Sequence, residues 1–162
     1  MLNLLIIFCY WALAAFRLHE GIRGSSMRRF LLSTPAEVVA EAELRLAASQ
    51  VPDEGPVTRF ISRMGMLMTL EMAVLLTEFA LLGWAWFSHS GWLALVALAL
   101  VLKNLVATAA GQWMAMHRDE KEGLFSLLLR LPRWATVLDR ISSLLSGAGF
   151  LAFFLHAFRQ QG

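Results

Sequence analysis

Four long runs of apolar residues limit what this chain can fold into more than any other feature of its sequence. They cover residues 1–16, 64–87, 91–116 and 141–158. A helix needs about 20 apolar residues to cross the roughly 30 Å hydrocarbon core of a bilayer. The second and third runs exceed this length, and the fourth is close to it. The first run is slightly short, so a re-entrant or interfacial segment is the alternative to a full span there.

The composition agrees with a membrane protein. Hydrophobic residues make up 58% of the 162 residues and charged residues 16%, against about 45–50% and roughly 25% in a soluble domain. The formal net charge is only +2 and no run of five basic residues occurs, so nucleic acid is not an expected partner. The single cysteine, Cys9, excludes an internal disulfide. We therefore predict an all-α integral membrane protein with about four transmembrane helices, folded as one domain over residues 1–162.

Arginine and lysine are distributed unevenly between the predicted connections. Residues 17–63 hold seven of them and residues 117–140 hold five, whereas Ser88–Ser90 holds none. Because basic loops stay on the cytoplasmic side, both long connections are predicted to be cytoplasmic and the short one extracytoplasmic. Four spans then place both termini outside the cytoplasm. The pattern predicts a multi-pass protein of the cell inner (plasma) membrane, with an organellar inner membrane as the alternative.

The two long connections carry signs of helices of their own. In the first, Thr34–Glu37 has the order of a capping box, with the threonine as N-cap and the proline as the first helical residue. A cytoplasmic helix is therefore predicted at about 35–49. In the second, the short apolar segment at about 123–131 predicts a helix that lies in the membrane interface. Pro132 is expected to start a helix that continues into the last span.

A few polar residues interrupt the apolar runs. Glu71 and Glu78 lie in the second run, and Lys103 lies in the third with Asn104 beside it. Ionisable residues inside a membrane are costly and usually face other helices or a cavity. The two glutamates are two helical turns apart on one face, and a tight turn near residue 89 would bring Lys103 between them in depth. We expect Lys103 to pair with one of them. We favour a structural role that fixes helix register over a relay for protons or ions.

Histidines are the candidates for haem ligands, because facing helices of a bundle can hold haem between paired imidazoles. All four lie at the edges of the predicted spans, and no two share a helix at the separation that two stacked haems require. These are His19, His89, His117 and His156. We therefore expect no haem, no other cofactor and no metal site.

Small residues at a spacing of four permit close approach of helix backbones, either within the chain or between chains. The third run has one such pair and the fourth has two. They are Ala107 with Gly111, Ser142 with Ser146, and Ser143 with Gly147.

Sequence motifs of common enzymes are lacking, since neither HExxH, GxSxG nor a P-loop occurs. We therefore expect an accessory or structural subunit of a larger inner-membrane complex, without a catalytic site of its own. Its partners would be membrane lipid and other membrane-protein subunits. The alternative is a small homo-oligomeric proton- or cation-coupled transporter or channel that uses Glu71, Glu78 and Lys103.

Overall fold

The described part of the chain is built from helices alone. The computed structural model describes residues 2–48, 55–88, 91–116, 123–129 and 133–160, and no strand occurs within these ranges. The helices are α1 (Leu2–Arg23), α2 (Ser26–Ser33), α3 (Ala36–Ala47), α4 (Pro56–Ser88), α5 (Trp92–Met116), α6 (Leu124–Leu129) and α7 (Arg133–Arg159).

Four of these helices, α1, α4, α5 and α7, are long and apolar enough to cross a membrane. This finding confirms the predicted class, an all-helical fold with four helices able to span. Three of them, α1, α4 and α7, are longer than the apolar runs that predicted them. At about 1.5 Å per residue, α1 reaches about 33 Å because it continues past residue 16 to Arg23. Likewise α4 begins at Pro56 and reaches about 50 Å, well beyond the thickness of a hydrocarbon core.

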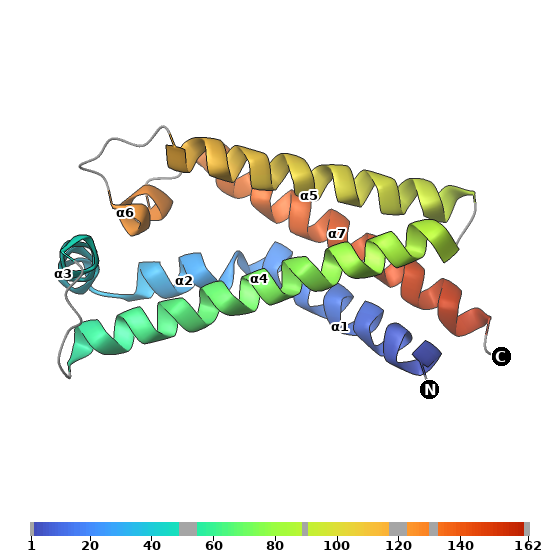
Figure 1. Cartoon of the computed structure of the whole chain (residues 1–162), viewed down its shortest axis with the longest axis horizontal. Helices are drawn as coiled ribbons and strands as arrows, with labels where there is room; N and C mark the ends of the chain where they lie inside the picture. Colours follow the sequence, from blue (N-terminus) through green and yellow to red (C-terminus); the bar gives the residue numbers. More distant parts are fainter. Residues whose placement is uncertain (1, 49–54, 89–90, 117–122, 130–132, 161–162) are drawn as a thin grey trace.

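The long helices run side by side along one axis of the molecule, and the short ones gather at one end (Figure 1). Helices α1 and α7 form the most extensive helix pair, and α4 packs on α5. Both chain termini lie at the same end of the molecule as the end of α4 and the start of α5, and we call this the terminal end (Figure 1). Helices α2, α3 and α6 lie at the opposite end, which we call the α3 end, and α3 is seen end-on there (Figure 1).

The larger hydrophobic core lies between the long helices, towards the terminal end. Tyr10 stacks on Phe153 with ring centroids 5.5 Å apart, and its hydroxyl donates to the carbonyl oxygen of Leu81 at 3.5 Å. The aromatic ring is thus buried while its polar atom has an acceptor, as a dry site requires. The buried members of this core are Tyr10, Leu13, Ala14, Leu82, Ala85, Leu93, Ala97, Leu100, Phe150 and Phe153.

Helices α1 and α7 approach each other closely through two glycines. A Cβ atom added at Gly147 would lie 2.7 Å from Leu18 Cγ and 3.0 Å from the Leu18 backbone nitrogen. A Cβ atom at Gly21 would lie 3.0 Å from the backbone nitrogen of Leu144. The small residues at 143 and 147 in the last span therefore serve contacts within the chain, in the way that small residues do between membrane helices.

A second hydrophobic core lies at the α3 end, where the first turns of α4 meet the short helices. Phe60 stands at its centre, stacked on Phe30 of α2 at 5.6 Å and edge-on to Phe125 of α6 at 5.3 Å. Its buried members are Leu31, Val39, Ala42, Val57, Phe60, Met64 and Phe125. Because α4 is long enough to enter both cores, it joins the two parts of the molecule.

The predicted capping box at Thr34 is wrong. The Thr34 hydroxyl donates to the carbonyl oxygen of Phe30 at 2.9 Å, and its backbone N–H donates to that of Leu31 at 3.2 Å. Thr34 therefore ends α2, a helix that the sequence did not predict. Pro35 occupies the N-cap of α3 instead, without a side-chain hydrogen bond.

Candidate functional site

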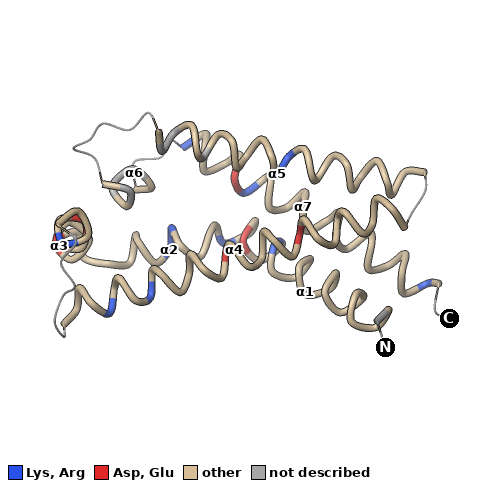
Figure 2. Tube along the Cα trace, viewed as in Figure 1, with Lys and Arg blue, Asp and Glu red and all other residues tan. Residues whose placement is uncertain are grey.

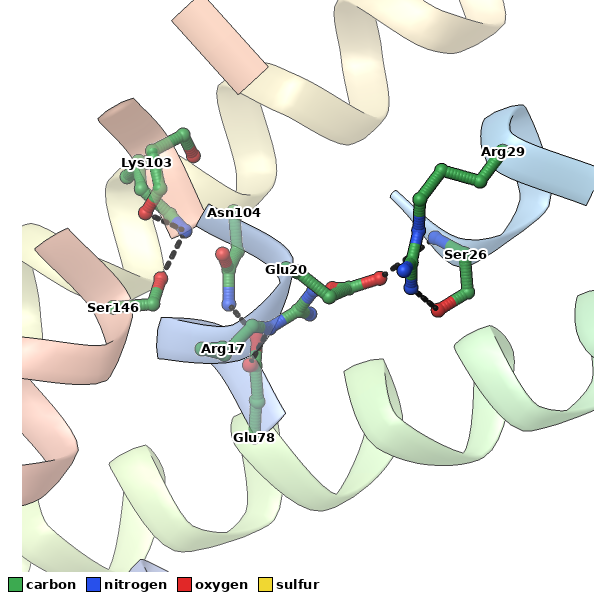
Figure 3. Close-up of polar contacts among 9 residues, drawn as sticks. Arg17, Glu20, Ser26, Arg29, Glu78, Lys103, Asn104 and Ser146 are labelled. Atoms are coloured by element: carbon green, nitrogen blue, oxygen red, sulfur yellow. Dashed lines mark hydrogen bonds and ion pairs between the residues drawn. The ribbon is translucent and has the colours of Figure 1, made fainter. Parts of the chain in front are cut away.

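A carboxylate without any exposed surface lies between the long helices. Glu78 of α4 is 0% exposed, and the Arg17 guanidinium of α1 donates through Nε to its Oε1 atom (Figure 3). Through Nη1 the same guanidinium donates to Oε2 of Glu20 at 2.9 Å. Arg17 thus lies between two carboxylates, one from its own helix and one from α4.

Asn104 completes the surroundings of Glu78. Its Nδ2 atom donates to Glu78 Oε2 at 3.1 Å, and its side chain is buried (Figure 3). Both carboxylate oxygens of Glu78 therefore have a donor, one from α1 and the other from α5. A buried charge with a cation and further hydrogen bonds around it is the arrangement that offsets loss of hydration.

Lys103 faces a different helix from the one that we expected. Its Nζ atom donates to Ser146 Oγ and, at 3.5 Å, to the carbonyl oxygen of Ser142, both on α7 (Figure 3). The ion pairs of the described residues include none between Lys103 and either glutamate of α4. Neighbouring residues of a helix point about 100° apart, so when Asn104 faces α4, Lys103 is directed towards α7.

Glu71 lies two helical turns from Glu78 on α4, nearer the α3 end, and is half-buried. Its electrostatic neighbours are Glu20, Arg17 and Asp139. Glu20, which is buried, and Glu71, which is half-buried, extend the site towards the α3 end. We call the set Arg17, Glu20, Glu71, Glu78, Lys103, Asn104 and Ser146 the charge cluster.

The depth of the charge cluster follows from helix geometry. At about 1.5 Å per residue, Glu78 lies about 15 Å from the end of α4 and Asn104 about 18 Å from the start of α5. These positions correspond to the middle of a hydrocarbon core of roughly 30 Å measured from the terminal end. Glu20 and Glu71 lie about 25–27 Å from that end, close to the opposite boundary.

Sequence reasoning identified Glu71, Glu78, Lys103 and Asn104 but missed the direct partner of Glu78. Arg17 comes directly after the first apolar run, at the start of the basic segment that predicts a cytoplasmic connection. The available signal was its spacing from Glu20, because charges three residues apart on a helix can pair and so allow the helix to continue into the membrane.

The structure describes two of the four histidines. His19 lies near the α3 end, with its Nε2 atom 3.5 Å from Arg29 Nη2. His156 lies near the terminal end on α7, with its Nε2 atom 3.0 Å from Gln160 Nε2. These two histidines are at opposite ends of the bundle, so they cannot hold one haem between them. His89 and His117 lie outside the described residues. Among the residues that are described, no group of three or more His, Cys, Asp or Glu side chains could hold a metal ion.

A pocket of about 300 Å³ opens at the terminal end between α1, α4 and α7, away from the charge cluster. Its lining combines aromatic, aliphatic and amide side chains. The lining residues are Asn3, Ile6, Ile7, Tyr10, Trp84, Ser88, Ala157 and Gln160.

Comparison with known protein families, with curated proteins and with solved structures finds no match to this chain.

Proposed function

We propose that this chain is an accessory, structural subunit of a larger protein complex in the inner membrane, without a catalytic site of its own. The observation that supports this most is the half of α5 nearer the α3 end. Residues 105–110 are six consecutive exposed positions. Since six residues cover every side of a helix, no side of this segment is buried against the rest of the described chain.

The composition of this uncovered segment favours a protein neighbour over lipid. Ala107, Thr108, Ala109 and Ala110 are small, and small residues are typical of the surfaces where membrane helices pack on one another. The terminal-end half of the same helix follows the ordinary pattern, with Leu93, Ala97 and Leu100 buried in the core.

The charge cluster also supports a structural role. Glu78 has a donor on each oxygen, and Lys103 donates to two oxygens of α7. A network whose polar groups all have partners holds the helices in one register. If one helix slid along another, a charge would be left unpaired in the apolar interior. In this proposal the cluster fixes the shape that α5 presents to its partner.

Photo-crosslinking in native membranes tests the subunit role. A photoreactive phenylalanine analogue at Ala109 is expected to crosslink to one foreign membrane protein that also co-purifies at a fixed ratio. The matched control is the same analogue at Leu95, which is 65% exposed in the other half of α5 and is expected to crosslink to no protein. Crosslinks at Ala109 to a second copy of this chain only, or to no protein at all, would contradict the proposal.

The second candidate function is a small homo-oligomeric proton- or cation-coupled transporter or channel. One observation favours it: acidic side chains continue from Asp139 through Glu71 and Glu20 to Glu78 in the middle of the bundle. In this case purified protein in liposomes would conduct protons or cations, and Glu71→Gln would abolish the flux. Glu41→Gln, on the exposed surface of α3, is the control. A flux that survives Glu71→Gln unchanged would exclude this residue from the pathway.

A further inference from the structure

The turn between α1 and α2 lies directly against α7. Gly24 forms this turn with a φ of +84°, a backbone conformation that favours glycine. A Cβ atom added at Gly24 would lie 3.4 Å from Nη2 and 3.6 Å from Nε of Arg140. The guanidinium of Arg140 therefore lies beside the turn, within ordinary contact of where a Cβ would be, and it is the positive φ that favours glycine at this position.

A second guanidinium reaches the same place from α2. Arg28 donates through Nη1 to the hydroxyl of Thr136. Thr136 and Arg140 are four residues apart on α7 and share one face of that helix. Arg28 and Arg140 are therefore neighbours across the junction of α2 with α7, although they lie 112 positions apart in the sequence.

The two guanidiniums keep free donors at this junction. The Nε atom of Arg28 is buried and has no hydrogen-bond partner among the described residues. Arg140 forms neither an ion pair nor a hydrogen bond within the part of the chain that the structure describes. Two neighbouring guanidiniums repel each other, and donors without acceptors are unfavourable. An anion between the two guanidiniums would remove both of these costs.

Acidic side chains of the chain itself offset these charges only in part. Asp139 is an electrostatic neighbour of Arg28. Glu20, the other carboxylate near the turn, is engaged by Arg17 at 2.9 Å and by the Ser26 backbone N–H at 3.5 Å. Figure 2 shows further basic residues of α2 and α4 on the side of the α3 end. The junction therefore keeps an excess of positive charge.

The depth of the junction indicates which anion fits. Gly24 lies about 33 Å from the start of α1, and Arg140 about 29 Å from the end of α7. Both are at the boundary of a hydrocarbon core of roughly 30 Å, where lipid phosphates lie. Ile22 and Ile141 follow on the membrane side and are 71% and 47% exposed, so an acyl chain would find apolar surface below the guanidiniums.

We propose that Arg28 and Arg140, together with the Gly24 turn, bind the phosphate of an anionic phospholipid headgroup. Guanidinium groups donate two hydrogen bonds in a fork that matches phosphate oxygens, and basic clefts between membrane helices are suited to anionic headgroups. The lipid would join α1, α2 and α7 at the membrane boundary. This site does not depend on the proposed subunit role.

Native mass spectrometry of the full-length protein tests the site. Protein from nanodiscs of phosphatidylglycerol and phosphatidylcholine is expected to retain one phosphatidylglycerol, and Arg140→Gln is expected to weaken its retention by about tenfold or more. Arg28→Gln should act in the same direction. Arg159→Gln is the matched control, since this exposed arginine lies at the other end of α7 and has no partner among the described residues.

Two further arms identify the source of the phosphate. Inorganic phosphate at millimolar concentration is expected to leave the retained lipid in place, because it lacks acyl chains, and a displaced lipid would overturn the lipid assignment. Equal retention of phosphatidylcholine would overturn the preference for an anionic headgroup. Thermal unfolding separates binding from folding: Arg140→Gln should melt like the wild type in pure phosphatidylcholine. Unchanged phosphatidylglycerol retention in a folded Arg28→Gln/Arg140→Gln double variant would overturn the site itself.

Discussion

At the scale of single residues, the buried position of Glu78 requires an explanation. A carboxylate with no exposed surface in an apolar bundle is tolerated only when cations and hydrogen bonds replace its lost hydration. The Arg17 guanidinium and the Asn104 amide do this from two different helices. Both partners of Glu78 lie far from it in the sequence, so the burial of this carboxylate depends on correct packing of the whole bundle.

Arg17→Met is expected to destabilise the protein by about 3–5 kcal/mol, because it leaves the Glu78 charge buried without its cation. The double variant Arg17→Met/Glu78→Gln should recover much of this loss, since it removes both charges. Thermal unfolding in detergent measures the effect, and Arg159→Met is the control at an exposed site. A double variant as unstable as Arg17→Met would show that the pair is not the source of the effect.

Lys103→Met is expected to cost less stability than Arg17→Met. Lys103 donates to Ser146 and to a backbone carbonyl, and both of these acceptors are neutral. Removing it therefore leaves no buried charge unpaired, and methionine is easier to place in the apolar interior. We expect a loss of about 1–2 kcal/mol by the same unfolding measurement. A loss as large as that of Arg17→Met would instead favour direct pairing of Lys103 with a carboxylate.

At the scale of helices, the sequence predicts where the spanning helices lie but not which residues of different helices contact one another. The four apolar runs predicted four helices able to span, because membrane helices are recognised from about 20 residues of local sequence. The pairing of Arg17 with Glu78 joins residues 61 positions apart, and the spacing of Arg17 from Glu20 indicates a longer helix but not which distant residue Arg17 meets. The end of α2 was not predicted for a different reason. A threonine is compatible with the end of one helix and with the start of the next, and in the structure the Thr34 hydroxyl donates to the carbonyl oxygen of Phe30 in α2.

The contact of α1 with α7 gives a prediction at this scale. Gly147→Ala is expected to destabilise the protein by about 1–3 kcal/mol, because the added Cβ would lie 3.0 Å from the Leu18 backbone nitrogen. Gly83→Ala on α4 is the matched control. Its Cβ would meet nothing within 4 Å, and alanine favours a helix over glycine by about 0.5–1 kcal/mol. If the two variants have the same unfolding temperature, the close approach of α1 and α7 is incorrect.

At the scale of the whole molecule, the basic residues and the two hydrophobic cores are both distributed unevenly along the long axis. The short helices and the first turns of α4 make a second core at the α3 end, and basic residues are concentrated on that side (Figure 2). The larger hydrophobic core lies nearer the terminal end, where the basic residues in the last turn of α7 are His156 and Arg159. The charge cluster lies between the two cores. This polarity could be predicted from arginine positions alone, whereas the second core could not, because its members come from four separate helices.

The polarity of the molecule leads to a prediction of its orientation. Because basic segments stay on the cytoplasmic side, the α3 end should face the cytoplasm and the terminal end the opposite side. In a Cys9→Ser background, Ser88→Cys at the exposed end of α4 should react with an impermeant maleimide added to intact cells or spheroplasts. Glu41→Cys, on the exposed face of α3, should react only after the membrane is opened. If both cysteines react from outside, the bundle does not cross the membrane along its long axis. If only Glu41→Cys reacts from outside, the bundle crosses the membrane in the opposite orientation. The arginines of the α3 end would then lie outside the cytoplasm, contrary to the usual distribution of basic segments.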